Sequence, residues 1–529
     1  MASPTYDYIV VGGGLAGCVL SSRIRQYDDA VKILLIEAGK ETRERSDVHN
    51  MQVLNLGSEL DWQYQSEPVE ALMGRRITLN AGKGLGGSSA INSGGWTRGA
   101  AADYDEWAAL VGDERYSYKG QLPWFKKSEL WFDDKNPEEH GKDGPIRVTC
   151  AKASNRMFPL AEQAAAGWEE LGVLTLPDGD QNTGDNLGRA YICEARSDGE
   201  REWSANQYSL DGIEVRLETF VNRVIIQKIH GNLKATGVEL ADSSVVKGHN
   251  IIVSAGAFRS PQLLQLSGIG PSTHLETFGI QPLVDLPEVG KNLSDHMIFF
   301  QHWRLRDPSA GHTIGSANPL FQQPQYSQGV PFDWIVNTGV PKEGLVKAIE
   351  RDEGAKPNDS KHVLLAKDRT FIENIVMFAK LPFPGVSMDA KHITSALVSF
   401  LPTSTGSVSL KSGKPEDHPK VNLNYLSTEV DNDQIIGESI PEGLLVEALA
   451  PDDSDEKLDQ RIAVTGGTSW HPSGTCSMGK VVDTEFRVTG VEGLRVVDAS
   501  VIPVPLSAHL QAPLYALSEQ AAAIITGKV

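Results

Sequence analysis

One histidine of this sequence stands in a constrained setting. His471 lies between Trp470 and Pro472 in the stretch SWHPSGTCSMG, which runs on into a turn of small residues. An imidazole has an ordinary pKa of about 6.5, so it can take up a proton near neutral pH. The proline fixes the local backbone, and a proton-transfer group loses much of its effect when it is misplaced. His471 is therefore a candidate for acid–base chemistry, and the rest of the chain must position it.

The start of the chain carries a glycine pattern suited to a dinucleotide. A short apolar strand leads into a G-x-G-x-x-G turn formed by Gly12, Gly14 and Gly17, and a helix-compatible run follows. These glycines allow a tight turn, a close approach to a pyrophosphate and close helix packing. Glu37 ends the buried-strand pattern KILLIEAG, where it can accept hydrogen bonds from a ribose. Strand, helix and acid in this register predict a dinucleotide-binding unit.

A later stretch repeats the plan of strand, turn and helix. Residues 251–270 predict a buried strand, a turn at Gly256 and a helix that begins near residues 260–261 and ends at Gly268.

Two further segments extend the nucleotide-binding pattern. The loop AGKGLGGSSAIN, Ala81 to Asn92, is too rich in glycine and serine for a core element, and its backbone amides suit an anion, although a flexible turn would look the same. The C-terminal segment predicts an apolar strand to Val497 and then a helix that Pro513 opens and Gly527 closes.

Length and charge bound the class of protein. The chain has 529 residues, more than the roughly 250 to 300 that one core accommodates, so we expect at least two domains. Its 69 acidic and 49 basic side chains give a net charge of −20. Such a field repels nucleic acid and anionic membranes, so we expect neither as a partner.

The cysteines and the apolar runs indicate the environment. The four cysteines show neither metal-ligand spacing nor a disulfide framework, so we expect reduced thiols and no metal site. We find no signal-peptide pattern before the first strand and no apolar run of about 18 residues. A cytoplasmic location is therefore expected, whereas the oligomeric state cannot be read from the sequence.

The intervening segments predict a second domain. Residues 299–455 alternate β-type runs such as HITSALVSFLP with charged, proline-rich loops. Alternation of this kind is typical of an antiparallel sheet with one solvated face. We predict an α/β fold in which a Rossmann-like nucleotide-binding domain is interrupted by a substrate domain. The first comprises residues 1–112, 205–298 and 456–529, and the second comprises residues 113–204 and 299–455.

Five separated motifs resemble those of the glucose–methanol–choline (GMC) family of flavoprotein oxidoreductases. They are VVGGGLAG with Glu37, GKGLGGSSAIN, GAFRSPQLLQLSGIG, VGKNLSDH, and HPSGTCSMG with the later SAHLQAPLYALSEQAA, and they follow the family order from residue 7 to residue 526. The resemblance implies the GMC fold, an FAD cofactor and the oxidation of a small-molecule alcohol. Electrons would pass to O2 or to another acceptor.

The resemblance also implies which residues hold FAD. The ADP part would lie on the N-terminal turn, and the flavin part along the second glycine loop and the C-terminal segments. The C-terminal helix would point its N-terminus at the flavin pyrimidine ring and stabilise the reduced anion by up to roughly 2 kcal/mol. The implied positions are Gly12, Gly14, Leu15, Ala16, Gly17, Glu37, Gly86, Gly87, Ser88, Asn92, Val224, Asp498, Ala499, Gln511 and Pro513.

Two histidines take the positions of catalytic groups in the family. His471 matches the base that takes the hydroxyl proton while hydride passes to flavin N5, and His509 matches the group that hydrogen-bonds the same oxygen. His296 in NLSDH is interpreted as a structural group at the domain boundary. Trp470 would either cover the reactive face of the flavin or pack in the core. We expect surface or satisfied core positions for His49, His140, His230, His249 and His392.

Two departures from the family pattern bear on these expectations. Some members attach FAD covalently to a histidine at the place that Ile91 takes here, so we expect noncovalent FAD. Between NYLSTEVD (424–431) and GESIPEG (437–443) the chain is shorter than is usual for the family. A shorter segment would open one wall of the substrate cavity.

Three classes of function remain open. The first is an FAD-dependent alcohol oxidase or dehydrogenase acting on an intracellular aromatic or polyketide alcohol. The second is a lyase of the hydroxynitrile-lyase kind, in which FAD is only structural, and the third is a catalytically silent binding protein. The five motifs and both histidines favour the first.

Overall fold

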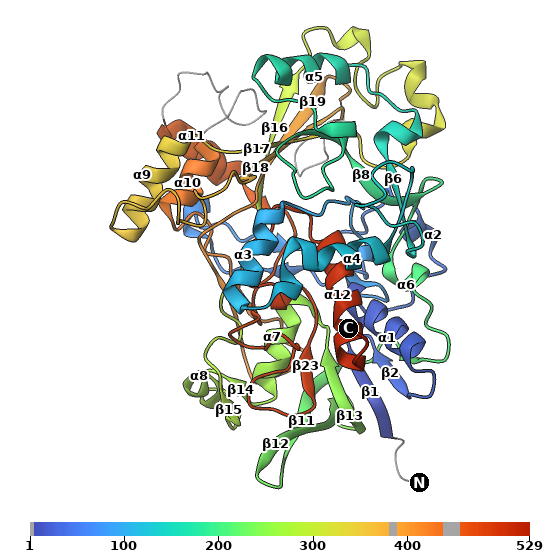
Figure 1. The fold of residues 1–529 in the computed structure, drawn as a ribbon, viewed down its shortest axis with the longest axis vertical. Coiled ribbons are helices and arrows are strands. Elements are labelled where there is room, and N and C mark those ends of the chain that lie inside the picture. Colours follow the sequence, from blue (N-terminus) through green and yellow to red (C-terminus); the bar gives the residue numbers. More distant parts are fainter. Residues whose placement is uncertain (1–4, 380–388, 437–454) are drawn as a thin grey trace.

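The computed structural model describes residues 5–379, 389–436 and 455–529. Two sheets organise these residues. In Figure 1 the sheet that contains β1 and β13 lies in the lower half, and the sheet that contains β16 to β19 lies in the upper half. The C-terminal helix α12 (Gln511–Thr526) packs against α1 (Leu15–Tyr27) and α4 (Tyr118–Ser128), so the two ends of the chain meet in one layer.

The first sheet has seven strands, in the order β10-β2-β1-β13-β12-β11, with β23 also paired to β13. The pairs among β10, β2, β1, β13 and β23 are parallel, whereas β11 and β12 form an antiparallel hairpin. All four residues of β2 are buried, as expected for a parallel strand covered on both faces. The strands are β1 (Thr5–Val11), β2 (Ile33–Ile36), β10 (Glu214–Arg216), β11 (Val221–Ile229), β12 (Asn232–Leu240), β13 (Val245–Val253) and β23 (Leu494–Val496).

The helix of the third motif begins earlier than the sequence predicted. α7 covers Gly256–Leu266, so Pro261 lies inside the helix and the expected start near residues 260–261 is wrong. Proline has no N–H to donate to the carbonyl four residues before it, that of Ala257. Thr475 Oγ1 donates to this carbonyl at 2.7 Å instead. A distant hydroxyl therefore makes the interior proline tolerable.

The C-terminal helix agrees with its prediction. Pro513 lies in the first turn of α12, and Gly527 ends the helix with a φ of 65°. A left-handed residue directly after a helix is a common way to end it, and glycine adopts this conformation without strain.

The second sheet has six antiparallel strands, in the order β22-β16-β19-β18-β17-β7. The run HITSALVSFLP forms β19 in this sheet, which confirms the predicted antiparallel architecture. The strands are β7 (Gly188–Tyr191), β16 (Met297–Arg304), β17 (Trp334–Thr338), β18 (Ile372–Met377), β19 (His392–Ser399) and β22 (Gly467–Thr468).

The expectation of one solvated face is wrong for this sheet. The first four residues of β18 are all buried, so side chains on both of its faces are covered. Leu345 and Ile349 of α9 (Lys342–Glu353) share a hydrophobic core with Ile372. The alternation in the sequence thus separates two differently lined interior faces.

The remaining elements are short, and the boundaries of the two domains stay a prediction. α10 (Glu429–Ile436) occupies the shortened segment, whereas GESIPEG lies outside the described residues. The other helices are α2 (Ser46–His49), α3 (Ala101–Val111), α5 (Ala161–Glu170), α6 (Ser204–Gln207), α8 (Ser272–Glu276) and α11 (Asp455–Thr465). The other strands are β3 (Tyr64–Gln65), β4 (Thr78–Leu79), β5 (Glu129–Trp131), β6 (Ile146–Cys150), β8 (Cys193–Ser197), β9 (Glu200–Arg201), β14 (Ile269–Gly270), β15 (Val284–Asp285), β20 (Ser407–Ser409) and β21 (Lys420–Asn422).

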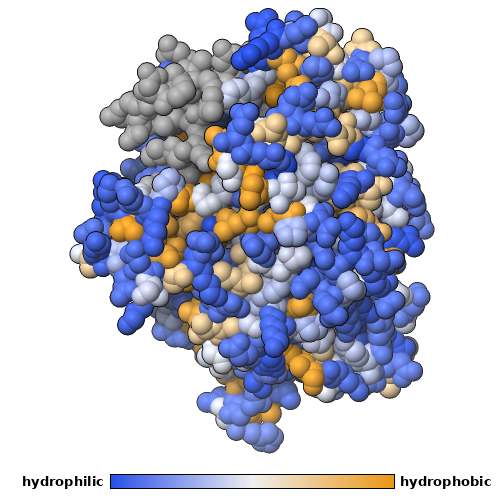
Figure 2. Space-filling model, turned by 45° about the horizontal axis from the view of Figure 1, so that its top comes forward, coloured by the Kyte–Doolittle hydropathy of each residue, from blue (hydrophilic) through white to orange (hydrophobic). Residues whose placement is uncertain are grey.

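Hydrophilic residues cover most of the face shown in Figure 2, whereas apolar residues lie near its centre and in several smaller patches. Within the described ranges, none of the helices combines the length and the apolar character needed to cross a bilayer.

Candidate active site

The N-terminal glycine turn has the geometry that its spacing predicts. Gly12 has a φ of 102°, and a Cβ on it would lie 2.3 Å from the carbonyl oxygen of Ser254. A Cβ on Gly17 would lie 1.9 Å from the carbonyl oxygen of Gly12, so the helix packs directly on the turn. α1 begins at Leu15, and its N-cap residue Gly14 contributes no side-chain hydrogen bond. The first N–H groups of the helix therefore remain for an anion.

Glu37 lies against this turn at the end of β2. Its Oε2 accepts from the N–H of Gly13 at 2.8 Å, and its Oε1 accepts from that of Gly39 at 2.8 Å. Burial raises the pKa of the Glu37 carboxyl to about 7. A buried acid beside the glycine turn suits the hydroxyls of a ribose.

The second glycine loop meets the first. The N–H of Gly86 donates to the carbonyl of Gly13 at 2.7 Å. A Cβ on Gly87 would come 2.7 Å from the Cα of Gly14, so the two backbones touch. Ser88 Oγ accepts from the N–H of Gly82 at 3.0 Å, which closes the loop on itself. The second glycine loop is therefore packed against the N-terminal glycine turn that precedes α1, and it is not the flexible turn that the sequence also allowed.

Asn92 and the start of α12 are joined directly. Asn92 Nδ2 donates to Gln511 Oε1 at 2.6 Å, and Gln511 Nε2 donates to the carbonyl of Gly94 at 3.3 Å. The N-terminus of α12, which includes Pro513, therefore lies beside the second glycine loop. The uncapped start of α1, the buried acid and the two touching glycine loops form a donor and acceptor set that fits a dinucleotide such as FAD.

Two implied cofactor positions are occupied by protein contacts. Asp498, which precedes Ala499, accepts hydrogen bonds from the N–H groups of Gly256 and Ser500, each at 2.8 Å. The N–H of Val224 donates to Ser267 Oγ at 2.8 Å. The direct contacts of Asp498, Ala499 and Val224 with FAD remain predictions.

Three histidines come together at the edge of the antiparallel sheet. The ring centroids of His471 and His509 lie 4.9 Å apart, and those of His471 and His296 lie 5.0 Å apart. His296 Nδ1 is 2.9 Å from His471 Nδ1, whereas His509 Nε2 is 2.8 Å from Glu373 Oε1. The two predicted catalytic histidines are therefore adjacent, and each has its own partner.

The two partners set opposite electrostatic environments. Burial, together with the nearby His509 and His296, holds the pKa of His471 well below its ordinary value. Burial also lowers the pKa of His509, but the charge and hydrogen bond of Glu373 raise this pKa above its ordinary value overall. His471 is thus a neutral imidazole at pH 7, and His509 is the ring that favours the charged form.

A buried aspartate fixes the backbone around His471. Asp295 Oδ1 accepts from the N–H of His471 at 2.9 Å, and Oδ2 accepts from Thr468 Oγ1 at 2.7 Å and from the Tyr425 hydroxyl at 2.5 Å. Burial raises the pKa of Asp295 to about 6. The position of His471 therefore depends on this aspartate as well as on the following proline.

Trp470 is not a core residue, so the prediction that it packs in the core is wrong. The alternative prediction, that it covers the reactive face of the flavin, stays open. Its side chain is 42% exposed, its φ is 61°, and its Nε1 donates to Asn80 Oδ1 at 3.0 Å. The left-handed backbone at this residue turns the chain so that Trp470 faces outwards while His471 faces inwards.

The cluster contains two residues beyond the predicted catalytic pair. His296, predicted to be a structural group at the domain boundary, contacts the candidate base. Glu373 was not identified, although a glutamate inside the apolar run of β18 is a signal, since a buried carboxylate needs a partner. The five histidines expected at the surface or in satisfied positions lie in such positions; His140, for example, lies between Glu129 and Asp180.

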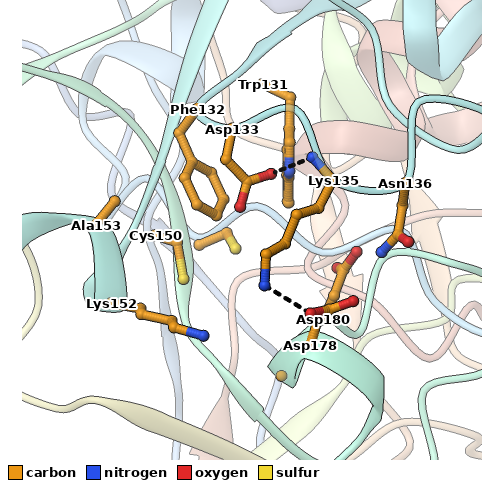
Figure 3. A pocket seen from close by; sticks show the side chains of 12 residues that line it. Trp131, Phe132, Asp133, Lys135, Asn136, Cys150, Lys152, Ala153, Asp178 and Asp180 are labelled. Atoms are coloured by element: carbon orange, nitrogen blue, oxygen red, sulfur yellow. Dashed lines mark hydrogen bonds and ion pairs between the residues drawn. The ribbon is translucent and has the colours of Figure 1, made fainter.

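A separate pocket of about 290 Å³ lies beside β6 and β8. Cys150 and Cys193, directly opposed across these strands, line it together with Trp131, and Figure 3 shows Lys135 reaching Asp178. The histidines of the cluster are not among its lining residues. This pocket and the histidine cluster are therefore distinct parts of the described chain.

Known proteins are similar to this chain along nearly its whole length. The GMC-type oxidoreductase acuG of Aspergillus aculeatus is 36% identical, with 98% of this chain and 99% of that protein aligned. An oxygen-dependent choline dehydrogenase of Pseudomonas fluorescens is 33% identical, with 99% of this chain and 94% of that protein aligned.

Solved structures agree with the fold. Pyridoxine 4-oxidase from Mesorbium loti matches with a TM-score of 0.80 at 25% identity, covering 98% of both chains. A fungal aryl-alcohol oxidase shares the fold with a TM-score of 0.79 at 22% identity, covering 99% of both chains. Family models described as GMC oxidoreductase match residues 6–298 and 402–518. The chain therefore belongs to the GMC oxidoreductase family, whose members are FAD-dependent oxidoreductases.

Proposed function

We propose that this chain oxidises the carbinol group of a small-molecule alcohol to a carbonyl, with His471 as the base. The observation that supports this proposal is the unequal pair of touching histidines. Within the described part of the chain, His509 has a carboxylate partner, whereas His471 has a second imidazole. Such a pair offers one proton acceptor and one proton donor to the same substrate oxygen.

The neutral state of His471 determines how it can act. A neutral imidazole donates from one nitrogen and accepts at the other. For Nε2 to accept the substrate proton, Nδ1 must carry the hydrogen and donate it to His296 Nδ1. Burial brings the pKa of His296 to about 3, so this ring is neutral. In the tautomer that carries its hydrogen on Nε2, Nδ1 of His296 accepts this hydrogen bond. His296 thereby selects the tautomer of His471 that can act as a base.

His509 supplies the complementary group. Its Nε2 binds Glu373, which leaves Nδ1 to donate a hydrogen bond to the substrate oxygen. A charged donor stabilises the negative charge that grows on this oxygen when His471 removes the proton. Because β18 is part of a sheet, Glu373 holds the ring in a fixed orientation.

FAD, when bound, supplies the acceptor for the hydride that leaves the carbinol carbon. The turn of Gly12, Gly14 and Gly17, with Glu37, would hold its ADP part. The second glycine loop with Asn92 would lie along its pyrophosphate and flavin, Val224 would meet the adenine, and Asp498 and Ala499 would lie near the phosphates and the ribityl chain. The start of α12 would place a partial positive charge near the flavin. Ile91 offers no covalent attachment, so the proposed binding is noncovalent.

The proposed substrate is an aromatic or polyketide alcohol made in the cytoplasm, and O2 or another acceptor takes up the electrons. Similar proteins include a choline dehydrogenase and an aryl-alcohol oxidase by name, which supports an alcohol as the substrate. Most of the antiparallel sheet would belong to the substrate domain, residues 113–204 and 299–455, whereas its edge strand β22 comes from the range predicted for the nucleotide-binding domain.

Anaerobic absorption spectra of the purified holoenzyme test the proposal. Adding a panel of primary and secondary alcohols should bleach the flavin with at least one of them, and readmitted air should restore the colour quickly only in an oxidase. The variant His471→Gln should keep its flavin but lose the bleaching, whereas the control variant His392→Gln, at a histidine paired with Asp389, should bleach normally. Turnover of a cyanohydrin without bleaching would reject the proposal and indicate a lyase.

A further inference from the structure

The face of the antiparallel sheet that carries Glu373 continues beyond the histidines. The strand register places Val398 of β19 opposite Glu373 on one side and Asn337 of β17 opposite it on the other. Residues directly opposite each other point to the same face of a sheet. Asn337 therefore lies about 4.8 Å beyond Glu373, one strand farther from the β16 side where His296 meets His471.

Asn337 forms an incomplete pair of amides with Gln181. Asn337 Nδ2 donates to Gln181 Oε1 at 3.3 Å. The other two atoms, Asn337 Oδ1 and Gln181 Nε2, are buried and have no hydrogen-bond partner among the described residues. The side chains are only 3% and 2% exposed, respectively. Exchanging oxygen and nitrogen in both amides leaves the same result, one unused donor and one unused acceptor.

Gln181 is anchored to the segment that holds His509. The next residue, Asn182, accepts from the N–H of Arg98 through Oδ1 at 2.9 Å. Thr97, which precedes Arg98, accepts from the N–H of His509 through Oγ1 at 2.7 Å. The amide pair is thus connected to the candidate active site both through the sheet and through this loop.

We propose that Asn337 and Gln181 form a specificity subsite that binds a second hydroxyl group of the substrate, separate from the hydroxyl that is oxidised. A hydroxyl donates one hydrogen bond and accepts another, which matches the unused acceptor and donor. Buried polar groups left without partners are unfavourable, so an alcohol that lacks this hydroxyl binds less well. This subsite rests on the proposed function and narrows its substrate class to diols and hydroxylated aromatic alcohols.

Matched alcohols test the subsite in the holoenzyme. The rate constant of anaerobic flavin reduction, divided by the dissociation constant, should be about 10- to 100-fold higher for 3-hydroxybenzyl or 4-hydroxybenzyl alcohol than for benzyl alcohol. The double variant Gln181→Met/Asn337→Leu replaces both amides with apolar groups of similar shape, a change that is close to neutral for folding. In this variant the rate constant divided by the dissociation constant should fall, for the hydroxylated alcohol, to the value for benzyl alcohol. The value for benzyl alcohol itself should change little.

Asn374 provides a matched control on the same sheet. Its buried Nδ2 also has no partner among the described residues, but Asn374 lies on the opposite face of β18 from Glu373. The variant Asn374→Leu should keep the full preference for the hydroxylated alcohol. A double variant that retains this preference, or a wild-type enzyme without one, would overturn the subsite.

A binding measurement separates failure of the subsite from failure of the proposed reaction. Benzoate and 3-hydroxybenzoate cannot be oxidised at a carbinol, and their binding is followed through the flavin absorbance. If no alcohol bleaches the flavin, yet 3-hydroxybenzoate binds about 10- to 100-fold tighter than benzoate only when both amides are present, the subsite stands and the oxidation fails. If alcohols bleach the flavin but neither measurement shows a hydroxyl preference, the reaction stands and the subsite fails.

Discussion

His296 Nδ1 lies 2.9 Å from His471 Nδ1, with the two ring planes at 80°. One nitrogen of the candidate base is therefore already engaged by another histidine. Because burial brings the pKa of His296 to about 3, this ring is neutral and does not compete for the substrate proton. In the proposed arrangement of hydrogens, its Nδ1 accepts the hydrogen bond from His471. In the proposed mechanism His296 is a positioning residue that acts through His471.

Replacing His296 should separate positioning from folding. In His296→Leu the hydrogen bond to His471 Nδ1 is lost, and we expect flavin reduction by alcohol to slow by about 10- to 100-fold. The side-chain oxygen of His296→Asn can accept the same bond and should recover most of the rate. Stopped-flow absorbance at saturating alcohol measures both. Equal losses in the two variants would show that His296 is only structural.

Removing the charge of Glu373 should move the pH profile of flavin reduction. The carboxylate raises the pKa of His509 above its ordinary value, so the imidazolium is present below that pKa and is lost as the pH rises through it. In Glu373→Gln this pKa falls, and the alkaline decline in the reduction rate should begin at a lower pH. In the wild type, the pair of His509 and Glu373 contributes its full stability below about pH 6.5. This contribution should disappear as the pH rises through the raised pKa of His509.

The partly buried pair of His392 and Asp389 is the control for this change. His392 Nδ1 lies 2.8 Å from an oxygen of Asp389, so Asp389→Asn removes a similar carboxylate away from the site. Its pH profile should match the wild type. A Glu373→Gln profile that also matches the wild type would contradict the assigned role of His509.

Gly12→Ala should abolish flavin binding. The added Cβ would lie 2.3 Å from the carbonyl oxygen of Ser254, and the φ of 102° is unfavourable for alanine. The control Gly231→Ala has a similar φ of 94° but no heavy atom within 4 Å of the new Cβ, so only backbone strain of about 1–2 kcal/mol applies. The ratio of flavin to protein absorbance should fall to near zero in the first variant and stay normal in the second. A normal ratio in both would refute the close packing of the turn.

FAD should leave the protein on denaturation. Ile91 is a buried aliphatic residue beside Asn92 and has no nucleophilic atom to bond the flavin. Mass spectrometry of the acid-denatured holoenzyme should therefore give the mass of the polypeptide alone. An added flavin mass would show that another side chain forms the attachment.

Several elements could be predicted because their signals are local. The Gly12 turn depends on backbone freedom within a few residues, and Gly527 ends α12 by its own left-handed conformation. The start of α7 was mispredicted because the signal came from outside the helix. Pro261 is tolerated inside the helix because Thr475, more than two hundred residues later, donates a hydrogen bond to the Ala257 carbonyl that the proline leaves without a donor.

The sequence alone determined the family, the glycine turn with its acid, and the two histidines, because each depends on residue types at short, fixed spacings. Tertiary structure decided the partners. Glu373 meets His509 from 136 residues away, and His296 meets His471 from 175 residues away. Strand order and register bring these residues together, and neither is encoded in local spacing. The protonation states and the amide pair beyond Glu373 therefore emerge only in the folded chain.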